Sequence, residues 1–197
     1  MKAKSSLHRR RKPTDRQVKI CLTGGIACGK SLLSEYLNAL GVETLDADEI
    51  VHELIPDPQE RKRIAAEVFN NPTKRKELED RLHPLVKERL MRWVEEAGED
   101  VIRVAVVPLL FEVGWEGEFD LVACVASPRE MQIERMVANR GYSRKEAELR
   151  MAAQLPVAEK AAKSDYVINN DSSSEELRKE TERFVSWLKN SMCSRIQ

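Results

Sequence analysis

A glycine-framed run near the start of the chain has the residue types and spacing of a phosphate-binding loop. The sequence reads GGIACGKS from Gly24 to Ser31, which matches the pattern GxxxxGK[ST]. Glycine has no Cβ, so the backbone can approach an anion closely and point successive N–H groups at it. A lysine and a hydroxyl at the end of such a loop bind the β- and γ-phosphates and Mg²⁺, respectively. The pattern therefore predicts a site for ATP with magnesium.

We assign the whole loop and the residue after it to ATP binding. These residues are Gly24, Gly25, Ile26, Ala27, Cys28, Gly29, Lys30, Ser31 and Leu32. Among them, Lys30 is expected to act in catalysis as well, and Ser31 is the expected Mg²⁺ ligand. A chance match in a glycine-containing turn is the alternative. The apolar strand expected before the loop and the amphipathic helix expected after it argue against chance.

Phosphoryl transfer to an alcohol also needs a carboxylate near the acceptor hydroxyl, to orient it and to accept its proton. Asp46-Ala47-Asp48 follows a short strand-like segment, at the sheet edge where ligands bind in open α/β folds. We expect one aspartate to face the γ-phosphate and the other to cap the helix that begins near Glu49. Asp48 is favoured as the base and Asp46 is assigned to the acceptor side. In the alternative interpretation both aspartates only cap the helix.

A charged stretch supplies candidates for a lid arginine that stabilises the charge on the transferred phosphoryl group. Its arginines are Arg129, Arg135, Arg140, Arg144 and Arg150. We favour Arg140 as the catalytic arginine because Gly141 follows it and indicates a boundary between a helix and a turn. For Arg129 and Arg144 we prefer a solvated helix face.

The elements that position these residues alternate between strands and helices. Apolar runs typical of strands occupy residues 18–23, 42–45, 101–110, 121–126 and 166–168, and helical spacing occupies 30–40, 49–97, 129–155 and 174–189. This order predicts a three-layer α/β domain over 18–197 with a mostly parallel five-stranded sheet. Residues 49–97 are expected to form a helical acceptor-binding insertion, and 129–155 a helical lid.

Composition excludes several other classes of protein. The 197 residues have zero net charge, but residues 1–17 hold seven of the 33 basic and one of the 33 acidic residues. We expect a basic, disordered leader on an acidic body, which has no general affinity for nucleic acid. No apolar run is long enough to span a membrane. The four cysteines form no zinc or disulfide pattern, which indicates reduced thiols and a cytoplasmic protein. An NKxD pattern is absent, which argues against a signalling GTPase.

Taken together, the motifs resemble those of dephospho-coenzyme A kinases. LTGGIACGKS, LDAD, LHPLV, VVPLLFE, NRGYS and DYVINN occur here in the order seen in that family. The resemblance implies a P-loop kinase fold and transfer of the γ-phosphoryl group of ATP to the ribose 3′-hydroxyl of dephospho-CoA. It also implies that Asp48 is the catalytic carboxylate, that Arg140 is the lid arginine, and that Asn170 lies near the adenine of ATP. Residues implied at the acceptor site are His83, Pro108, Leu109, Leu110 and Glu112.

The sequence departs from the family pattern at two places. Ala27-Cys28 stands where the family usually has Gly-Ser, and Leu32 where it usually has Thr. With Lys30 and a helix N-terminus nearby, we expect a lowered pKa for the Cys28 thiol, so that its alkylation blocks ATP binding. The second departure lies between His52 and Val68, where the family has roughly two dozen more residues. This leaves open another small-molecule kinase, or a weakly active nucleotide-binding regulator. The sequence indicates no oligomeric state.

Overall fold

A single parallel β-sheet forms the centre of the structure, a computed structural model that describes residues 17–69, 71–98 and 101–195. Its strands lie in the order β2-β3-β1-β4-β5, and every neighbouring pair is parallel. The bounds are β1 (Ile20–Gly24), β2 (Val42–Asp46), β3 (Ile102–Val106), β4 (Leu121–Ala126) and β5 (Tyr166–Asn169). The prediction of a parallel five-stranded α/β sheet is therefore confirmed.

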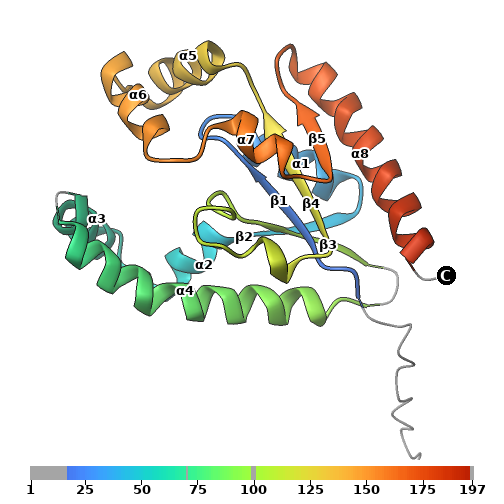
Figure 1. The fold of residues 1–197 in the computed structure, drawn as a ribbon, viewed down its shortest axis with the longest axis horizontal. Coiled ribbons are helices and arrows are strands. Elements are labelled where there is room, and N and C mark those ends of the chain that lie inside the picture. The colour runs from blue at the N-terminus through green and yellow to red at the C-terminus, as the bar shows by residue number, and fades with distance from the viewer. Residues whose placement is uncertain (1–16, 70, 99–100, 196–197) are drawn as a thin grey trace, which may run out of the picture.

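Helices connect the strands and cover both faces of the sheet (Figure 1). They are α1 (Lys30–Ala39), α2 (Ala47–Leu54), α3 (Pro58–Phe69), α4 (Pro72–Glu95), α5 (Arg129–Arg140), α6 (Arg144–Ala152), α7 (Val157–Ala162) and α8 (Ser174–Arg195), with a 3₁₀ turn at Glu116–Glu118. Parallel strands need such crossovers, and strands covered on both faces are apolar throughout. All five residues of β1 are buried accordingly.

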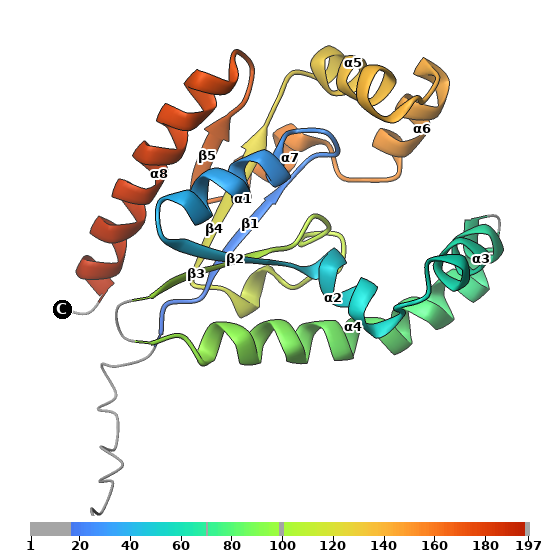
Figure 2. The same cartoon turned by 180° about the vertical axis from the view of Figure 1, so that it is seen from behind.

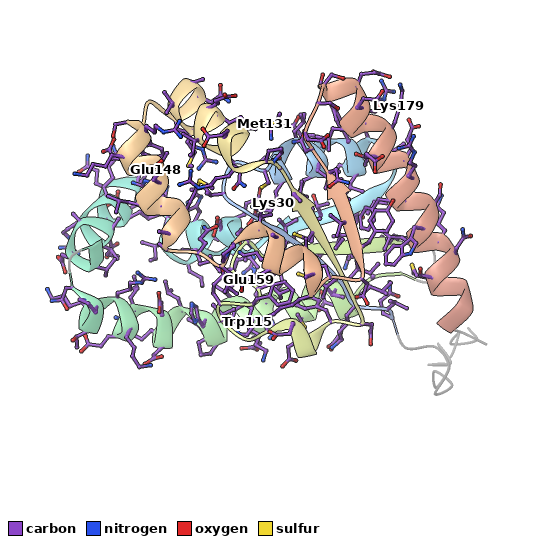
Figure 3. The ribbon with its side chains drawn as sticks, turned by 45° about the horizontal axis from the view of Figure 1, so that its top comes forward. Lys30, Trp115, Met131, Glu148, Glu159 and Lys179 are labelled. Atoms are coloured by element: carbon purple, nitrogen blue, oxygen red, sulfur yellow. The ribbon has the colours of Figure 1, made fainter. Side chains whose placement is uncertain are left out.

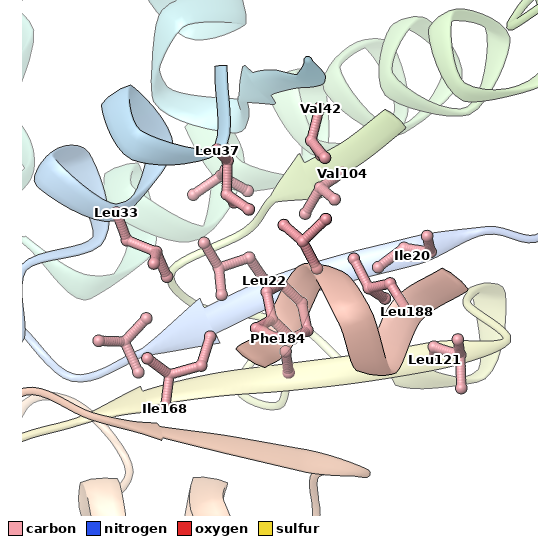
Figure 4. Close-up of a cluster of buried hydrophobic side chains, with 14 of the residues drawn as sticks. Ile20, Leu22, Leu33, Leu37, Val42, Val104, Leu121, Ile168, Phe184 and Leu188 are labelled. Carbon is pink, nitrogen blue, oxygen red and sulfur yellow. The ribbon is translucent and has the colours of Figure 1, made fainter. Parts of the chain in front are cut away.

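One hydrophobic cluster fills the space between the sheet and helices α1 and α8 (Figure 4). Leu33 and Leu37 are one helical turn apart on α1, and Phe184 and Leu188 are spaced in the same way on α8. All four side chains are fully buried. The cluster fixes α1, and with it the loop at the N-terminus of α1, against the sheet.

A second cluster lies on the opposite face, under α4 and the segment that follows β3. Cys21, Ala105 and Val122 belong to this cluster, while their strand neighbours belong to the first. This division is the two-residue alternation of a strand. Leu90 and Val94 of α4 are fully buried in the second cluster.

Two helical units extend from the carboxyl end of the sheet on the same side of the molecule. Figures 1 and 2 show α5 and α6 as one unit and α3 with the first half of α4 as the other. Among the described residues of the 49–97 region the structure has α2, α3 and α4 and no strand, as predicted. The 129–155 region forms two helices instead of one continuous stretch, and Gly141, with φ 67°, ends the first of them.

Two expectations need correction or lie outside the described residues, and one helix was not expected. The strand predicted for 101–110 ends at Val106, because the chain turns over the next residues, where Pro108 lacks an N–H. The sequence analysis did not predict α7. The leader predicted for 1–17 lies outside the described residues except for Gln17, whose Nε2 donates to the carbonyl of Val101. No helix in the described part of the chain has the length and apolar character needed to cross a bilayer.

Candidate active site

The phosphate-binding loop joins β1 to α1, and glycine is required where it turns. Gly24 has φ 149°, and a Cβ there would lie 2.4 Å from the carbonyl oxygen of Val125. Gly29 has φ 93°, and a Cβ there would lie 2.2 Å from Nδ2 of Asn170. Both dihedrals and both contacts exclude a side chain. The loop is therefore held against β4 on one side and against the residue after β5 on the other.

Lys30 is the first residue of α1, and its ammonium group lies inside the loop. Nζ donates to the carbonyl oxygens of Gly24 at 3.0 Å and of Gly25 at 2.8 Å. Burial lowers the pKa of this lysine, because desolvation disfavours the charged form. In the view of Figure 3, Lys30 lies near the centre of the molecule, below Met131 of α5 and above Glu159 of α7. A lysine placed in this way can reach phosphates bound to the loop.

The two aspartates after β2 have different environments. Asp46 is the N-cap of α2, and its Oδ1 accepts a hydrogen bond of 2.9 Å from the backbone N–H of Asp48. Burial raises the pKa of Asp46 to about 6. Asp48, in the first turn of α2, is exposed. The structure thus assigns capping to Asp46 and leaves the carboxylate of Asp48 outside the cap; the role of Asp48 as the base remains a prediction.

Arg135 and Asn170 form a polar brace behind the loop. Nδ2 of Asn170 donates to the carbonyl of Cys28 at 2.9 Å. Arg135 donates to the carbonyl of Ala27 at 3.3 Å, and also to the side-chain and backbone oxygens of Asn170. A charged guanidinium therefore links α5, part of the predicted lid, to the loop. The sequence analysis singled out Asn170 but did not choose Arg135 among the arginines.

A cavity of about 640 Å³ brings these groups together at the carboxyl end of the sheet. Predicted site residues that line it are Ile26, Ala27, Gly29, Lys30, Ser31, Leu32, Asp46, Asp48, Pro108, Arg140 and Asn170. Further lining residues are Arg135, Asn139, Gln154, Ser172 and Ser174. The cavity thus holds an anion cradle, two carboxylates and two arginines, which is the set of groups that phosphoryl transfer needs.

A family model described as dephospho-CoA kinase matches this chain over residues 18–60 and 58–176. The chain belongs to the dephospho-CoA kinase family. It is 35% identical to the dephospho-CoA kinase of Helicobacter pylori strain J99, over 86% of this chain and 96% of the relative. It is 36% identical to that of Geobacter sulfurreducens, over 86% of this chain and 97% of the relative.

Solved structures share the fold. TT1252 from Thermus thermophilus has a TM-score of 0.74 at 31% identity, covering 88% of this chain and 98% of its own. Dephospho-CoA kinase from Campylobacter jejuni has a TM-score of 0.59 at 25% identity, covering 85% and 95%. Shikimate kinase from Acinetobacter baumannii, at 14% identity and a TM-score of 0.61, covers 91% and 98% and shows the fold alone.

This member of the dephospho-CoA kinase family is shortened in its helical insertion. The two matched segments meet at residues 58–60, where α3 begins. The match to the Helicobacter relative spans 189 positions, whereas 86% of this 197-residue chain is about 169 residues, so some twenty positions have no counterpart here. Both observations agree with the departure expected between His52 and Val68.

Several residues that the family resemblance placed at the acceptor site do not line the cavity. Leu110 is fully buried in the second hydrophobic cluster. Leu109 is 39% exposed, and the ring of His83 packs edge-on against Trp115 at 5.6 Å between ring centroids. Acceptor binding by these three residues remains a prediction. Pro108, from the same VVPLLFE motif, does line the cavity.

The carboxylate of Glu112 is paired with other groups of the protein. Its Oε1 lies 2.7 Å from Nζ of Lys160, whose side chain is fully buried, and accepts a hydrogen bond of 3.0 Å from the N–H of Leu155. The same ammonium donates to the carbonyl of Pro108 at 2.8 Å. The ion pair therefore ties α7 and the end of the lid to the segment after β3. An acceptor contact by Glu112 remains a prediction.

The prediction of a lowered pKa for Cys28 is wrong. Its side chain is buried, and burial raises the thiol pKa although Lys30 acts in the opposite direction. The other departure in the loop, Ala27, has a strained backbone conformation. Ala27 has φ 57°, a left-handed conformation that costs a residue with a Cβ about 1–2 kcal/mol.

The arginines of α5 and α6 have different surroundings, and a catalytic role for Arg140 remains a prediction. Arg129 and Arg144 are more than half exposed and pair with Glu130 and Glu148 on the outer face. Arg140 ends α5 and lines the cavity. The spacing in the sequence could have singled out Arg135. It lies three residues from Gln132 and four from Asn139, which places the three side chains on one face of α5, the face that meets the loop.

Proposed function

We propose that this chain phosphorylates the ribose 3′-hydroxyl of dephospho-CoA with ATP, giving coenzyme A. The observation that carries the proposal is the single cavity that contains Lys30, Asp48, Pro108 and Arg140. The free thiols Cys21, Cys28 and Cys124 support a reducing cytoplasmic location.

The loop and two oxygen-bearing side chains beside it, those of Ser31 and Asp46, support ATP as the second substrate and Mg²⁺ as its cofactor. Within the described residues no cluster of three or more His, Cys, Asp and Glu side chains could hold a metal. Mg²⁺ needs no such cluster, because it binds through one or two protein oxygens together with water and phosphate oxygens. The Ser31 hydroxyl and the nearby Asp46 carboxylate fit that demand. The ion would neutralise developing charge on the β- and γ-phosphates.

Each of the site residues then has a distinct part in the transfer. Loop N–H groups and the Lys30 ammonium hold the phosphates in line with the acceptor. Asp48 orients the acceptor hydroxyl and accepts its proton, a contribution of typically 10²–10⁴-fold in rate. Arg140 approaches the transferred group from the lid and stabilises its charge. Arg135 fixes the loop from behind through its bonds to Ala27 and Asn170.

An acceptor panel tests the proposal. ADP release is measured with dephospho-CoA, adenosine, cytidine and shikimate. Turnover with dephospho-CoA alone supports it, turnover with a different acceptor favours another small-molecule kinase, and tight ATP binding without turnover favours a nucleotide-binding regulator.

Three variants test the residue roles. Lys30→Ala is expected to remove turnover and to weaken ATP binding strongly. Asp48→Asn is expected to lower kcat by about 10²-fold or more while ATP binding is kept. Glu176→Gln is the control, since this carboxylate is 47% exposed on α8, away from the cavity lining, and pairs with Lys179. A normal rate for Asp48→Asn would remove Asp48 as the base.

A further inference from the structure

Gln154 carries an unsatisfied polar atom at the edge of the active-site cavity. The residue lines the cavity together with Asp48 and Pro108. Its Oε1 is the single buried side-chain nitrogen or oxygen in the described part of the chain that has no hydrogen-bond partner. A buried carbonyl left in this way costs about 1–3 kcal/mol. Such a group in a native protein needs an explanation, and a ligand is one.

The backbone around Gln154 fixes which side of the cavity this residue occupies. It follows α6, and its N–H donates to the carbonyl of Met151 at 3.1 Å. The next residue, Leu155, donates its N–H to Glu112 at 3.0 Å. Gln154 is therefore anchored at the base of the lid, beside the segment that contributes Pro108 to the cavity.

The chemistry of the carbonyl selects its ligand. Phosphate oxygens of ATP are hydrogen-bond acceptors, as Oε1 is, so a triphosphate cannot satisfy it. A sugar hydroxyl is a donor and can. Within the described residues no hydrogen bond holds the Gln154 side chain, and the terminal torsion of glutamine is broad. The amide can therefore turn toward a sugar bound in the cavity.

We propose that Gln154 is an acceptor-binding residue whose side-chain carbonyl accepts a hydrogen bond from the ribose 2′-hydroxyl of the acceptor. The reacting 3′-hydroxyl gives its proton to Asp48, so the adjacent 2′-hydroxyl is the donor available to Gln154. This inference rests on the proposed function and deepens it, because it assigns recognition of the ribose diol to the base of the lid.

A two-by-two comparison tests the contact. We compare kcat/KM of the wild type and of Gln154→Leu for dephospho-CoA and for its 2′-deoxy analogue. Either change alone is expected to lower kcat/KM about tenfold, the value of one hydrogen bond of this kind. The variant with the 2′-deoxy analogue is expected to have a kcat/KM no lower than either single change gives, because both changes remove the same hydrogen bond. Losses that multiply, or no loss in Gln154→Leu, would overturn the inference.

Stability and ATP affinity separate this role from a structural one. Gln154→Leu removes the unsatisfied carbonyl, so its thermal midpoint is expected to equal or exceed that of the wild type, with unchanged Kd for ATP. A lower midpoint or weaker ATP binding would contradict the assignment. Leu149→Ala, at a position of α6 that is 63% exposed, is the control and should change neither kinetics nor ATP binding. Failure of the wild type to use dephospho-CoA would instead overturn the proposed function.

Discussion

Replacing Lys160 by methionine removes a charge from the interior while nearly preserving side-chain length. In the wild type the ammonium group is fully buried and lies 2.7 Å from Glu112 and 2.8 Å from the carbonyl of Pro108. In the variant, the Glu112 side chain, 18% exposed, keeps one hydrogen-bond donor among the described residues, the N–H of Leu155. The carbonyl of Pro108 keeps only the Thr23 hydroxyl at 3.3 Å. The variant therefore leaves a largely buried carboxylate without a counter-charge.

The expected loss is large for a single substitution. Removing one partner of a buried ion pair costs about 3–5 kcal/mol. In a chain of this size each kcal/mol lowers the thermal midpoint by about 2–4 °C. We therefore expect Lys160→Met to melt roughly 6–20 °C below the wild type. In urea, the unfolding midpoint should fall while the slope is unchanged.

Two further variants make the measurement specific to burial. Lys179→Met breaks an ion pair with Glu176 in which both side chains are about half exposed, so its cost should stay below about 1 kcal/mol. The double variant of Lys160→Met with Glu112→Gln leaves no unpaired charge at this position and should be more stable than Lys160→Met alone. The reasoning is refuted if Lys160→Met costs no more than Lys179→Met, or if the double variant is the least stable of the series.

Three other changes have defined outcomes. Burial raises the pKa of Asp46 from 3.8 to about 6, so the free energy of unfolding of the wild type should fall as the pH rises from 3.8 to about 6. Asp46→Asn keeps a capping side chain and should remove that fall. Urea unfolding at pH 4 and pH 7 measures both proteins. Equal pH dependence in both proteins would contradict this. Gly29→Ala places a Cβ 2.2 Å from Nδ2 of Asn170, so ATP should bind at least about tenfold more weakly by calorimetry; unchanged affinity would argue against this loop geometry. Buried Cys28 should react with iodoacetamide at pH 8 only after unfolding in urea, as followed by mass spectrometry; rapid labelling of the folded protein would show that the thiol is accessible.

The sequence predicted the loop and the sheet because their signals are local. A strand, a glycine-framed turn and an amphipathic helix follow one another within residues 17–40. The assignment of each one supports the assignment of its neighbour. The end of β3 was less clear, since apolar residues continue through Leu110. Of these, Val107 and Leu110 are buried beside the sheet, in the second cluster, and not within it. Apolar character alone does not separate the two cases.

Features that depend on distant residues could not be predicted in this way. Nothing adjacent to Lys160 indicates burial, and lysine is ordinarily exposed. Its ion pair with Glu112 spans 48 positions between α7 and the segment after β3. The raised pKa of Cys28 has the same origin, since the nearby Lys30 is visible in the sequence and the burial is not. The helix α7 was missed because six residues are too few to show a period.

The insertion formed by α3 and the first half of α4 has almost no interior of its own. Between Leu54 and Leu85 none of the side chains that the structure describes is fully buried, whereas α8 and β1 contribute several. Helices held by so few apolar contacts open at low free energy. Backbone amides of this insertion should therefore exchange with deuterium long before those of the sheet. Binding of an acceptor there would slow the exchange, and part of its affinity would be spent on ordering the helices that receive it.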